Sequence, residues 1–363
     1  MSLDMREDND NQEVMQKLSR LVVEKITGRQ INDSKVIISP LMINYFSFVF
    51  SIEVSNSQNT QKVFVKIPKE DIRQGPKAIL PISSADRRLA EDEAHSLRTL
   101  AEQWRSKDLG VSWVRLVGEV PDYNALVMSA EEGDEALTVF RRLDLRRRFG
   151  NCKARYRLRE AMSRLGTALG RFHLQNTAEG DFFPDLATPK ILKYLEYVGA
   201  CTRSVWLSRV VGLIERFGTL PIAGVMTSTL KGIDIRNVLL DDDGHIVMFD
   251  PGRMKMAYRE EDLARFLMTW RMLYWGTGWF ALGLRPDPVS EAAFLDCYYE
   301  VMGPTSDRLL DFFMFKEILK SWYIAYIALS LKTWPQHVNR LVARYYIDRF
   351  FEGQLVLQSK KFV

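Results

Sequence analysis

Apolar residues follow two different periods along the chain, and the change from one to the other divides it. In the first third, short runs of β-branched and aromatic residues predict strands. Between them, apolar residues recur every three or four positions, which predicts helices. The expected strands are 36–38, 48–54, 63–67, 113–120 and 125–128, and the expected helices of this part are 11–29 and 84–104. After residue 133 the helical period dominates, so a small sheet precedes a large helical part.

The helical part is interrupted once, at residues 238–249. Two short apolar runs there flank the turn Asp242-Asp243-Gly244, and Asp-Gly between such runs is typical of a β-hairpin. We expect an α+β fold of two lobes, joined by the polar connector near 129–134. The predicted segments are a flexible N-terminus over 1–12, an N-terminal lobe over 13–130 with a five-stranded antiparallel sheet, and a helical C-terminal lobe over 131–363 that carries the hairpin.

Composition limits the class of protein. The chain has 363 residues, of which 47% are hydrophobic and 26% charged, so it can bury a substantial core. A net charge of +4 is small for this length and gives no reason to expect nucleic acid. Three scattered cysteines suit reduced thiols, and the acidic, polar start is unlike a secretory signal. The longest uncharged apolar stretch, 272–284, is too short to span a bilayer. We therefore expect a soluble, cytoplasmic protein without a transmembrane segment.

Four residues that could serve a nucleotide and a metal follow one another along the chain. Lys66 lies in the expected strand VFVKIP, from which an ammonium can pair with phosphates. Glu93, in the helix that follows, could hold that ammonium in place. Asn237 and Asp250 flank the expected hairpin, so their oxygen atoms could share one Mg²⁺ ion. Each residue alone suits a surface charge or a turn cap, but all four in this order favour a nucleotide site.

This arrangement resembles the aminoglycoside phosphotransferase and choline kinase group within the protein-kinase-like fold. The similarity covers roughly residues 35–270. The matching segments are Lys66, Glu93, the connector after LVMSAEEG, the loop ending in Asn237-Val238-Leu239-Leu240, Asp250-Pro251-Gly252, the helix from Leu165-Gly166 to His173, and Glu261-Asp262-Leu263-Ala264.

The resemblance implies a two-lobed fold with a small antiparallel-sheet N-lobe and a large helical C-lobe. It places ATP or GTP against Lys66, Glu93 and Met128, and Mg²⁺ on Asn237 and Asp250. In the family Asp262 would brace the backbone of the catalytic loop. The implied reaction moves the γ-phosphoryl group to a hydroxyl of a small molecule or a saccharide, an anionic one included.

The loop LKGIDIRN at 230–237 departs from that family at its catalytic residue. A match on Asn237 without gaps puts Gly232 where the family has its catalytic aspartate. A shifted match makes Asp234 the base, but leaves two residues between it and Asn237 where kinases have four. The phosphate-covering turn at 39–47, SPLMINYFS, also has no glycine. Two hypotheses follow: a phosphotransferase with impaired catalysis and Asp234 as surrogate base, and a pseudokinase that binds nucleotide or a partner protein without turnover.

A basic run occupies residues 141–159, RRLDLRRRFGNCKARYRLR. It holds nine Lys or Arg against one Asp, with Phe149 and Tyr156 interleaved. A solvated helical face explains such a run most simply. The second interpretation is contact with an anionic acceptor or a membrane surface, and nucleic acid comes last.

Overall fold

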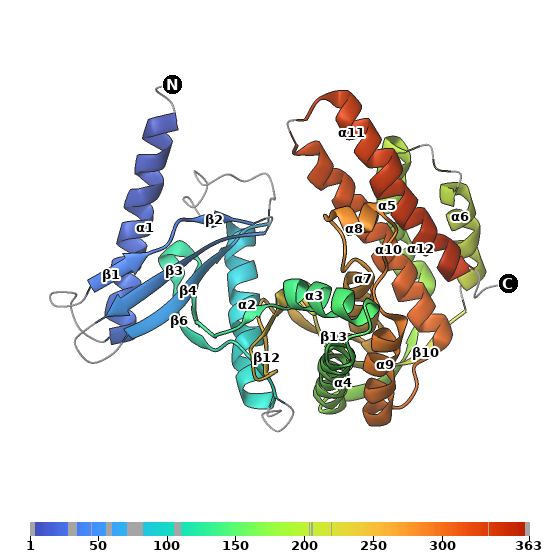
Figure 1. Ribbon diagram of the computed structural model, residues 1–363, viewed down its shortest axis with the longest axis horizontal. Helices are drawn as coiled ribbons and strands as arrows, with labels where there is room; N and C mark the ends of the chain where they lie inside the picture. The colour runs from blue at the N-terminus through green and yellow to red at the C-terminus, as the bar shows by residue number, and fades with distance from the viewer. Residues whose placement is uncertain are drawn as a thin grey trace. The chain divides into compact units, whose positions relative to one another are not determined.

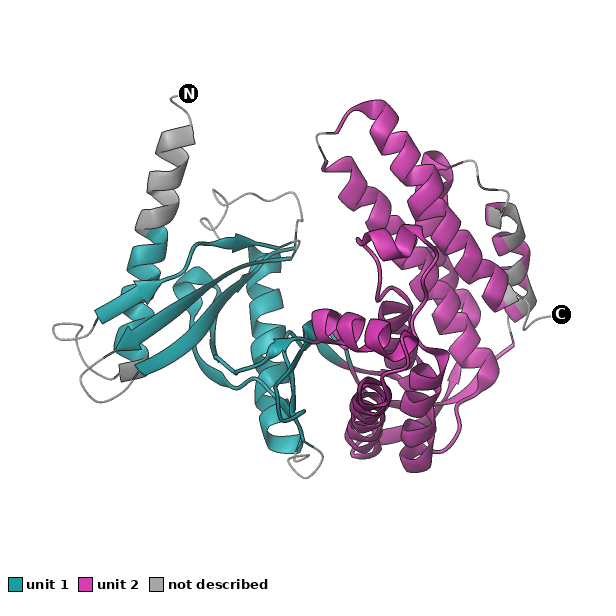
Figure 2. Cartoon of the chain, viewed as in Figure 1, with its two compact units in different colours: residues 1–135, 230–232, 237–254 teal, residues 136–229, 233–236, 255–363 magenta. Residues whose placement is uncertain are grey.

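The chain divides into two compact units, each described here by itself. The computed structural model describes residues 4–27, 35–44, 46–55, 60–70, 83–104, 110–202, 204, 206–218, 220–332 and 334–359 (Figure 1). Figure 2 colours the two units. Unit 1 comprises Met1–Glu135, Leu230–Gly232 and Asn237–Met254, and unit 2 comprises Ala136–Thr229, Ile233–Arg236 and Lys255–Val363.

Unit 1 is built on a six-stranded antiparallel sheet. The strand order is β1-β3-β4-β7-β6, with β2 paired to β3. The strands are β1 (Lys35–Ile38), β2 (Met42–Ile43), β3 (Ser47–Ser55), β4 (Thr60–Pro68), β6 (Leu116–Val120) and β7 (Ala125–Ser129). Every second residue of β3 from Phe48 to Val54 is buried, because alternate side chains of a strand point to one face.

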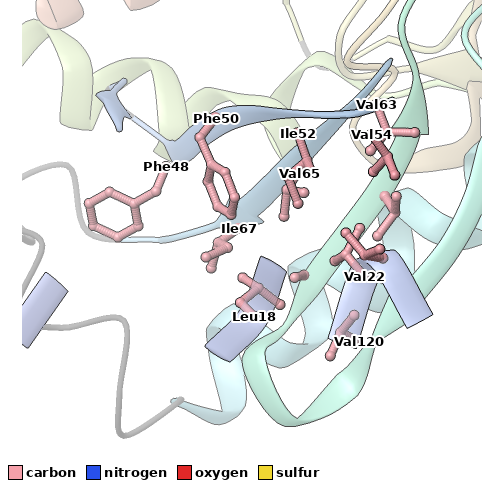
Figure 3. Packing of buried hydrophobic residues seen from close by; sticks show 13 residues of the cluster. Leu18, Val22, Phe48, Phe50, Ile52, Val54, Val63, Val65, Ile67 and Val120 are labelled. Atoms are coloured by element: carbon pink, nitrogen blue, oxygen red, sulfur yellow. The ribbon is translucent and has the colours of Figure 1, made fainter. Parts of the chain in front are cut away.

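The buried face of this sheet packs against the first helix, α1 (Asp4–Thr27). Leu18 and Val22 of α1 lie in one cluster with apolar side chains of the sheet (Figure 3). The sheet contributes Phe48, Phe50, Ile52, Val54, Val63, Val65, Ile67 and Val120, among others. This apolar layer fixes which residues of β4 face the other way, and Lys66 is one of them.

The opposite face of the sheet is covered by α2 (Ser84–Gln103). Ala90 and Ala94 of this helix pack with Leu126 of β7, and Leu97 packs with Met128. The helix begins at an N-cap, Ser83, whose hydroxyl accepts a hydrogen bond from the backbone of the first turn. Because α2 lies on this face, its residue Glu93 comes to the same side of the sheet as Lys66.

A second, four-stranded sheet carries the expected hairpin. Its order is β5-β12-β11-β8, and β12 pairs parallel with β5. The strands are β5 (Val111–Trp113), β8 (Asp134–Glu135), β11 (Val238–Leu240) and β12 (Ile246–Met248). The expectation that the hairpin belongs to the helical part is therefore wrong, because its pairing to β5 and β8 ties it to unit 1. The expected strand 113–120 is likewise two strands in two sheets.

Unit 2 is largely helical. Its helices are α3 (Ala136–Arg148), α4 (Cys152–Leu174), α5 (Pro184–Cys201), α6 (Trp206–Phe217), α7 (Arg259–Arg271), α8 (Gly278–Ala281), α9 (Pro288–Met302), α10 (Asp307–Ser330), α11 (Gln336–Val342) and α12 (Arg349–Ser359). Helices α4 and α9 pack so closely that a Cβ at Gly166 would lie 2.1 Å from the carbonyl oxygen of Phe294. Helix α10 packs against α7, α5 and α12, which accounts for its almost continuous apolar sequence.

The sequence pattern misses the two-residue strands β2 and β8, three longer strands and one helix start. The strands β9 (Thr177–Phe182), β10 (Ile222–Leu230) and β13 (Met254–Tyr258) form a three-stranded sheet where only helices were expected. Helix α1 begins at Asp4, within the N-terminus expected to be flexible, and residues 1–3 lie outside the described ones. The α+β class is confirmed. Within the described ranges, no helix is both long and apolar enough to cross a membrane.

Candidate active site

Lys66 and Glu93 form a buried ion pair in unit 1. The Lys66 ammonium donates to both carboxylate oxygens of Glu93, at 2.7 and 2.8 Å. Both side chains are buried. The pair forms because β4 turns Lys66 away from the apolar layer and α2 presents Glu93 to that face. The pairing expected from the sequence is confirmed.

Asp250 completes the cluster. Its Oδ1 accepts from the Lys66 ammonium at 2.6 Å, and its side chain remains 44% exposed. Asp250 lies two residues after the end of β12 and has φ of +54°, a backbone region in which Asp is one of the better-tolerated residues. The segment after it is held by α2, because the Ser96 hydroxyl accepts from the backbone N–H of Met254 at 2.9 Å. Two ends of unit 1, 184 residues apart, thus meet at one ammonium.

Electrostatics explain why Lys66 stays charged in this position. Burial alone would lower its pKa, but the charges of Asp250 and Glu93, with their hydrogen bonds, raise it above the usual 10.5. Burial raises the pKa of Glu93 against the opposing pull of Lys66, and the charge of Asp250 adds to that rise. One ammonium between two carboxylates leaves an excess of negative charge, and the exposed side of Asp250 is where a cation can reach it.

Asn237 lies at the other end of the hairpin. Its amide nitrogen donates to the carbonyl oxygen of Gly232 at 3.0 Å, and more weakly to that of Asp250 at 3.5 Å. These bonds use the donor end of the side chain, so the amide oxygen is the atom left for a cation.

The oxygen atoms of Asn237 and Asp250 fit what Mg²⁺ requires. No group of three or more His, Cys, Asp or Glu suited to a metal occurs among the residues the structure describes. A metal ion here would therefore have few protein ligands and would complete its shell with water and phosphate oxygens. Mg²⁺ binds in this way, whereas a closed all-protein cage suits other metals.

Gly232, which the sequence resemblance places at the catalytic position, packs backbone against backbone. Its N–H donates to the carbonyl oxygen of Pro251 at 2.8 Å. A Cβ at this position would lie 1.7 Å from the carbonyl oxygen of Asp250. Only glycine permits such an approach. The loop at 230–237 and the segment after Asp250 are therefore joined through Gly232, at the position where the resemblance led us to expect a catalytic aspartate.

Asp234, the expected surrogate base, is buried and paired with its neighbour Arg236. Its Oδ1 accepts from the backbone N–H of Arg236 at 2.8 Å, and its two oxygens accept from the guanidinium Nε at 2.9 and 3.1 Å. Arg236 Nη2 also contacts Oδ2. Asp234 and Arg236 belong to unit 2, whereas Lys66, Glu93, Asn237 and Asp250 all belong to unit 1.

Met128 and the phosphate-covering turn complete the expected nucleotide contacts. Met128, on β7, is buried with Leu97, Val114 and Val247. The turn at 39–47 forms the short hairpin of β2 and β3, closed by a hydrogen bond from Asn44 N–H to the carbonyl oxygen of Ser47 at 2.9 Å; Tyr45 lies outside the described residues. A role for either in nucleotide binding stays a prediction.

A buried histidine network in unit 2 contains one residue that the sequence did not indicate. His173 Nε2 lies 3.2 Å from Asp262 Oδ2, and His173 Nδ1 lies 2.8 Å from the Tyr298 hydroxyl. All three side chains are fully buried. Asp262 thus braces a helix of unit 2 through His173. Tyr298 joins from α9, 125 residues along the chain, and carries no local signal of this role.

The basic run 141–159 is partly structural. Arg147 and Arg148 pair with the buried Asp144, at 2.8 and 3.1 Å. Arg141 donates to the carbonyl oxygens of Leu273 and Trp275. The rest of the run is mostly exposed, with Phe149 at 85% and Tyr156 at 68%. The exposed part remains open to solvent or to an anionic partner.

Comparison with known proteins identifies the fold. No family profile and no curated protein sequence matches the chain. A macrolide 2′-phosphotransferase from Brachybacterium faecium matches with a TM-score of 0.50 at 11% identity, over 90% of this chain and 97% of that one. A choline kinase from Streptococcus pneumoniae matches at 0.50 and 14%, over 94% and 99%. A choline kinase from Cryptosporidium parvum matches at 0.50 and 10%, over 90% and 89%. The chain has the protein-kinase-like fold of these enzymes, as the sequence resemblance implied.

Proposed function

We propose that the protein binds Mg²⁺-ATP or Mg²⁺-GTP at the Lys66 cluster and transfers the γ-phosphoryl group to a hydroxyl of a small molecule or saccharide. The observation that carries this proposal is the contact of Lys66 with both Glu93 and Asp250. A lysine held by a helix glutamate beside a metal-binding aspartate is what phosphoryl transfer in this fold uses.

Each residue of the cluster has a distinct task. Glu93 holds the ammonium, and Lys66 binds phosphate oxygens as a point charge. Asp250 and Asn237 would hold Mg²⁺, which neutralises charge on the transferred group. Because Lys66 contacts Asp250 directly at 2.6 Å, nucleotide binding requires the ammonium to exchange part of that contact for phosphate oxygens.

Nucleotide-dependent stabilisation tests the binding step. Mg²⁺-ATP or Mg²⁺-GTP should raise the melting temperature of the wild type, since a ligand at a hundredfold its Kd adds about 2.7 kcal/mol. Lys66→Met should remove this shift. Lys62→Met is the matched control, because Lys62 is an exposed lysine on the same strand. If wild-type protein shows no shift with millimolar nucleotide, or if both variants lose it equally, the proposal fails.

Turnover is the step that two observations call into question. Position 232 has no room for an acidic side chain, and the carboxylate of Asp234 is paired with Arg236. They favour a second candidate function, a pseudokinase that binds nucleotide without transferring its phosphoryl group. Release of ADP from Mg²⁺-ATP, measured over hours with and without candidate hydroxyl acceptors, separates the two. A missing base lowers the rate by about 10²–10⁴-fold and does not abolish it, so slow but Asp250-dependent turnover supports the transferase.

A further inference from the structure

One helix near the end of unit 2 leaves an apolar stripe uncovered. Helix α11, the π-helical segment η5 (Ala343–Asp348) and α12 form one continuous helix (Figure 1). Along its first part, Trp334, Val338, Leu341 and Tyr345 recur at intervals of four, three and four residues, a spacing that puts them on one side of a helix. Trp334 is 47% exposed, Leu341 54% and Tyr345 61%, whereas a helix of a globular protein normally buries such a stripe against its core.

The inner side of the same helix is fixed to the rest of unit 2. The ring centres of Tyr346 and Phe280 lie 4.5 Å apart. The buried Asp348 accepts from Trp322 Nε1 at 3.0 Å and from the Tyr326 hydroxyl at 2.6 Å. Because these contacts hold the inner side, the apolar stripe is kept at the surface of unit 2.

Positive charge borders this stripe. Residues 331–347 contain no Asp or Glu, and they contain Lys332, Arg340 and Arg344. All three side chains are exposed, and no carboxylate of the described residues pairs with them. The Arg344 guanidinium lies 5.4 Å from the centre of the Tyr345 ring. We call the exposed stripe together with these three cations the α11 face.

This combination of side chains fits the surface of an anionic lipid bilayer. A helix that lies on such a surface has Trp or Leu on its apolar side and Lys or Arg beside it. Trp and Tyr favour the level of the lipid headgroups, because one end of the side chain is apolar and the other is wet. The negative potential of the leaflet attracts Lys and Arg close to it.

Other occupants suit the α11 face less well. A second copy of the chain would bring one basic face against another in a symmetric dimer, where like charges repel. Single-stranded nucleic acid is bound in a basic groove by aromatic rings that stack on its bases. The α11 face is the outer side of a single helix, and Leu341 lies between its aromatic residues.

We propose that the α11 face docks on the surface of an anionic lipid bilayer, with its aromatic rings among the headgroups and its cations at the lipid phosphates. The contact is peripheral, because the other side of the helix stays packed on unit 2. Docking requires neither Lys66 nor a nucleotide, so it does not depend on the proposed function.

Sedimentation with vesicles measures the docking and its charge dependence. The full chain is mixed with vesicles of phosphatidylcholine, or of phosphatidylcholine and phosphatidylglycerol in equal parts. Wild-type protein should bind the mixed vesicles and not the neutral ones, and added salt should weaken binding. Arg340→Gln with Arg344→Gln should weaken binding about 10-fold or more, since each basic residue near an anionic leaflet contributes about fivefold. Arg171→Gln with Lys193→Gln is the matched control, because it removes the same charge from exposed positions of α4 and α5.

The apolar part of the α11 face is tested in the same assay. Leu341→Gln should weaken binding about fivefold or more, because the leucine no longer leaves water at the interface. Leu186→Gln is its control, since Leu186 is an exposed leucine of α5. Both variants should unfold in urea as the wild type does, which excludes misfolding. Lys66→Met should bind the mixed vesicles as tightly as the wild type.

Tryptophan fluorescence locates the contact. Mixed vesicles whose phosphatidylcholine is brominated on its acyl chains should quench the wild-type protein more than the same vesicles without bromine. Trp334→Phe should lose most of this difference and still bind, because phenylalanine keeps the apolar ring. Equal quenching of the wild type and Trp334→Phe would show that another surface meets the lipid, and would overturn the inference.

Three results of the vesicle assay also overturn it: no binding to the mixed vesicles, equal binding to the neutral ones, or equal binding by the α11-face variants and their controls. A single-stranded oligonucleotide that binds where vesicles do not would assign the face to nucleic acid. A dimer that Leu341→Gln dissociates, again without vesicle binding, would assign it to a second copy. Vesicle binding by protein that shows no nucleotide shift would refute the proposed function and leave the docking surface in place.

Discussion

Gly232 lies so close to the carbonyl of Asp250 that no side chain fits between them. A Cβ built on Gly232 would be 1.7 Å from the carbonyl oxygen and 2.8 Å from the carbonyl carbon of Asp250. Both partners are backbone, which cannot rotate away as the end of a side chain can. The residue that the sequence resemblance places at the catalytic position thus joins the loop to the segment that carries Asp250.

Alanine or aspartate at position 232 should therefore destabilise the protein. We expect Gly232→Ala to lower the free energy of unfolding by about 1–3 kcal/mol, as overpacking of a tight contact does, and Gly232→Asp to lower it at least as much. Urea unfolding measures both. Gly353→Ala is the control: a Cβ at this position of α12 meets nothing within 4 Å, so alanine should stabilise the helix. A stable Gly232→Asp variant with faster ATP hydrolysis would contradict this packing.

The sequence predicted the cluster well because its geometry is local to regular elements. Alternation along β4 puts Lys66 opposite the apolar residues Val65 and Ile67, and the helical period of α2 puts Glu93 on its buried face. A hairpin signal brings Asn237 and Asp250 to the same end of two strands. Strand and helix periods alone therefore fix most of this site.

Other features depend on contacts that no local pattern encodes. The parallel pairing of β12 with β5 joins residues 135 positions apart, such as Ile246 and Val111, and it moves the hairpin into unit 1. The backbone contact of Gly232 is visible in the sequence only as a glycine. A glycine at this place is explained equally well by a turn. Strand β9 contains Glu179 and Asp181, and strand β10 contains Gly224. Such residues are uncommon in strands and weaken the apolar pattern that marks one.

The pairing of Asp234 with Arg236 gives a test of the surrogate base. If Asp234 takes the proton from the acceptor, Asp234→Asn should lower phosphoryl transfer by about 10²-fold or more, with nucleotide affinity little changed. Arg236→Gln, which removes the guanidinium bound to the carboxylate, should also lower the rate, because the carboxylate then loses the group that holds it in position. Initial rates at saturating nucleotide measure both. Rates unaffected by either substitution would exclude Asp234 from the reaction.

The basic run should separate into a structural and a surface part. Arg147→Gln removes a partner of the buried Asp144, and we expect it to cost about 1–3 kcal/mol of stability, because Tyr274 and Arg148 still contact that carboxylate. Arg155→Gln, at an exposed position of α4, should leave urea unfolding unchanged within about 0.5 kcal/mol. Equal losses from both variants would show that the pairing of Arg147 with Asp144 does not stabilise the protein.

The exposed part can then be examined for an anionic partner without loss of fold. Arg155→Glu with Arg159→Glu reverses two exposed charges on α4 and leaves Asp144 paired. If the run holds an anionic surface, the double variant should weaken binding to vesicles containing anionic lipid and reduce the dependence of that binding on salt. If the wild-type protein does not bind such vesicles, the exposed part of the run is a solvated helical face.

The acid limb of the stability curve should depend on Glu261. Burial would raise the pKa of this carboxyl, but the charges of Lys316, Lys255 and Arg265 lower it to about 2, from a usual 4.5. A carboxyl whose pKa is lowered on folding contributes stability above its unfolded pKa and loses it as the pH falls through the folded pKa. The full contribution is roughly 3 kcal/mol, at 1.36 kcal/mol for each pKa unit.

Urea unfolding between pH 5.5 and pH 3 measures this contribution. Over that interval the wild type should lose about 2 kcal/mol more than Glu261→Gln does, because the variant has no proton to take up at this position. Glu160→Gln is the control, since Glu160 forms a surface pair with Arg164 on α4 and should leave the slope unchanged. If the wild type and Glu261→Gln lose stability in parallel, the lysines do not hold Glu261 ionised.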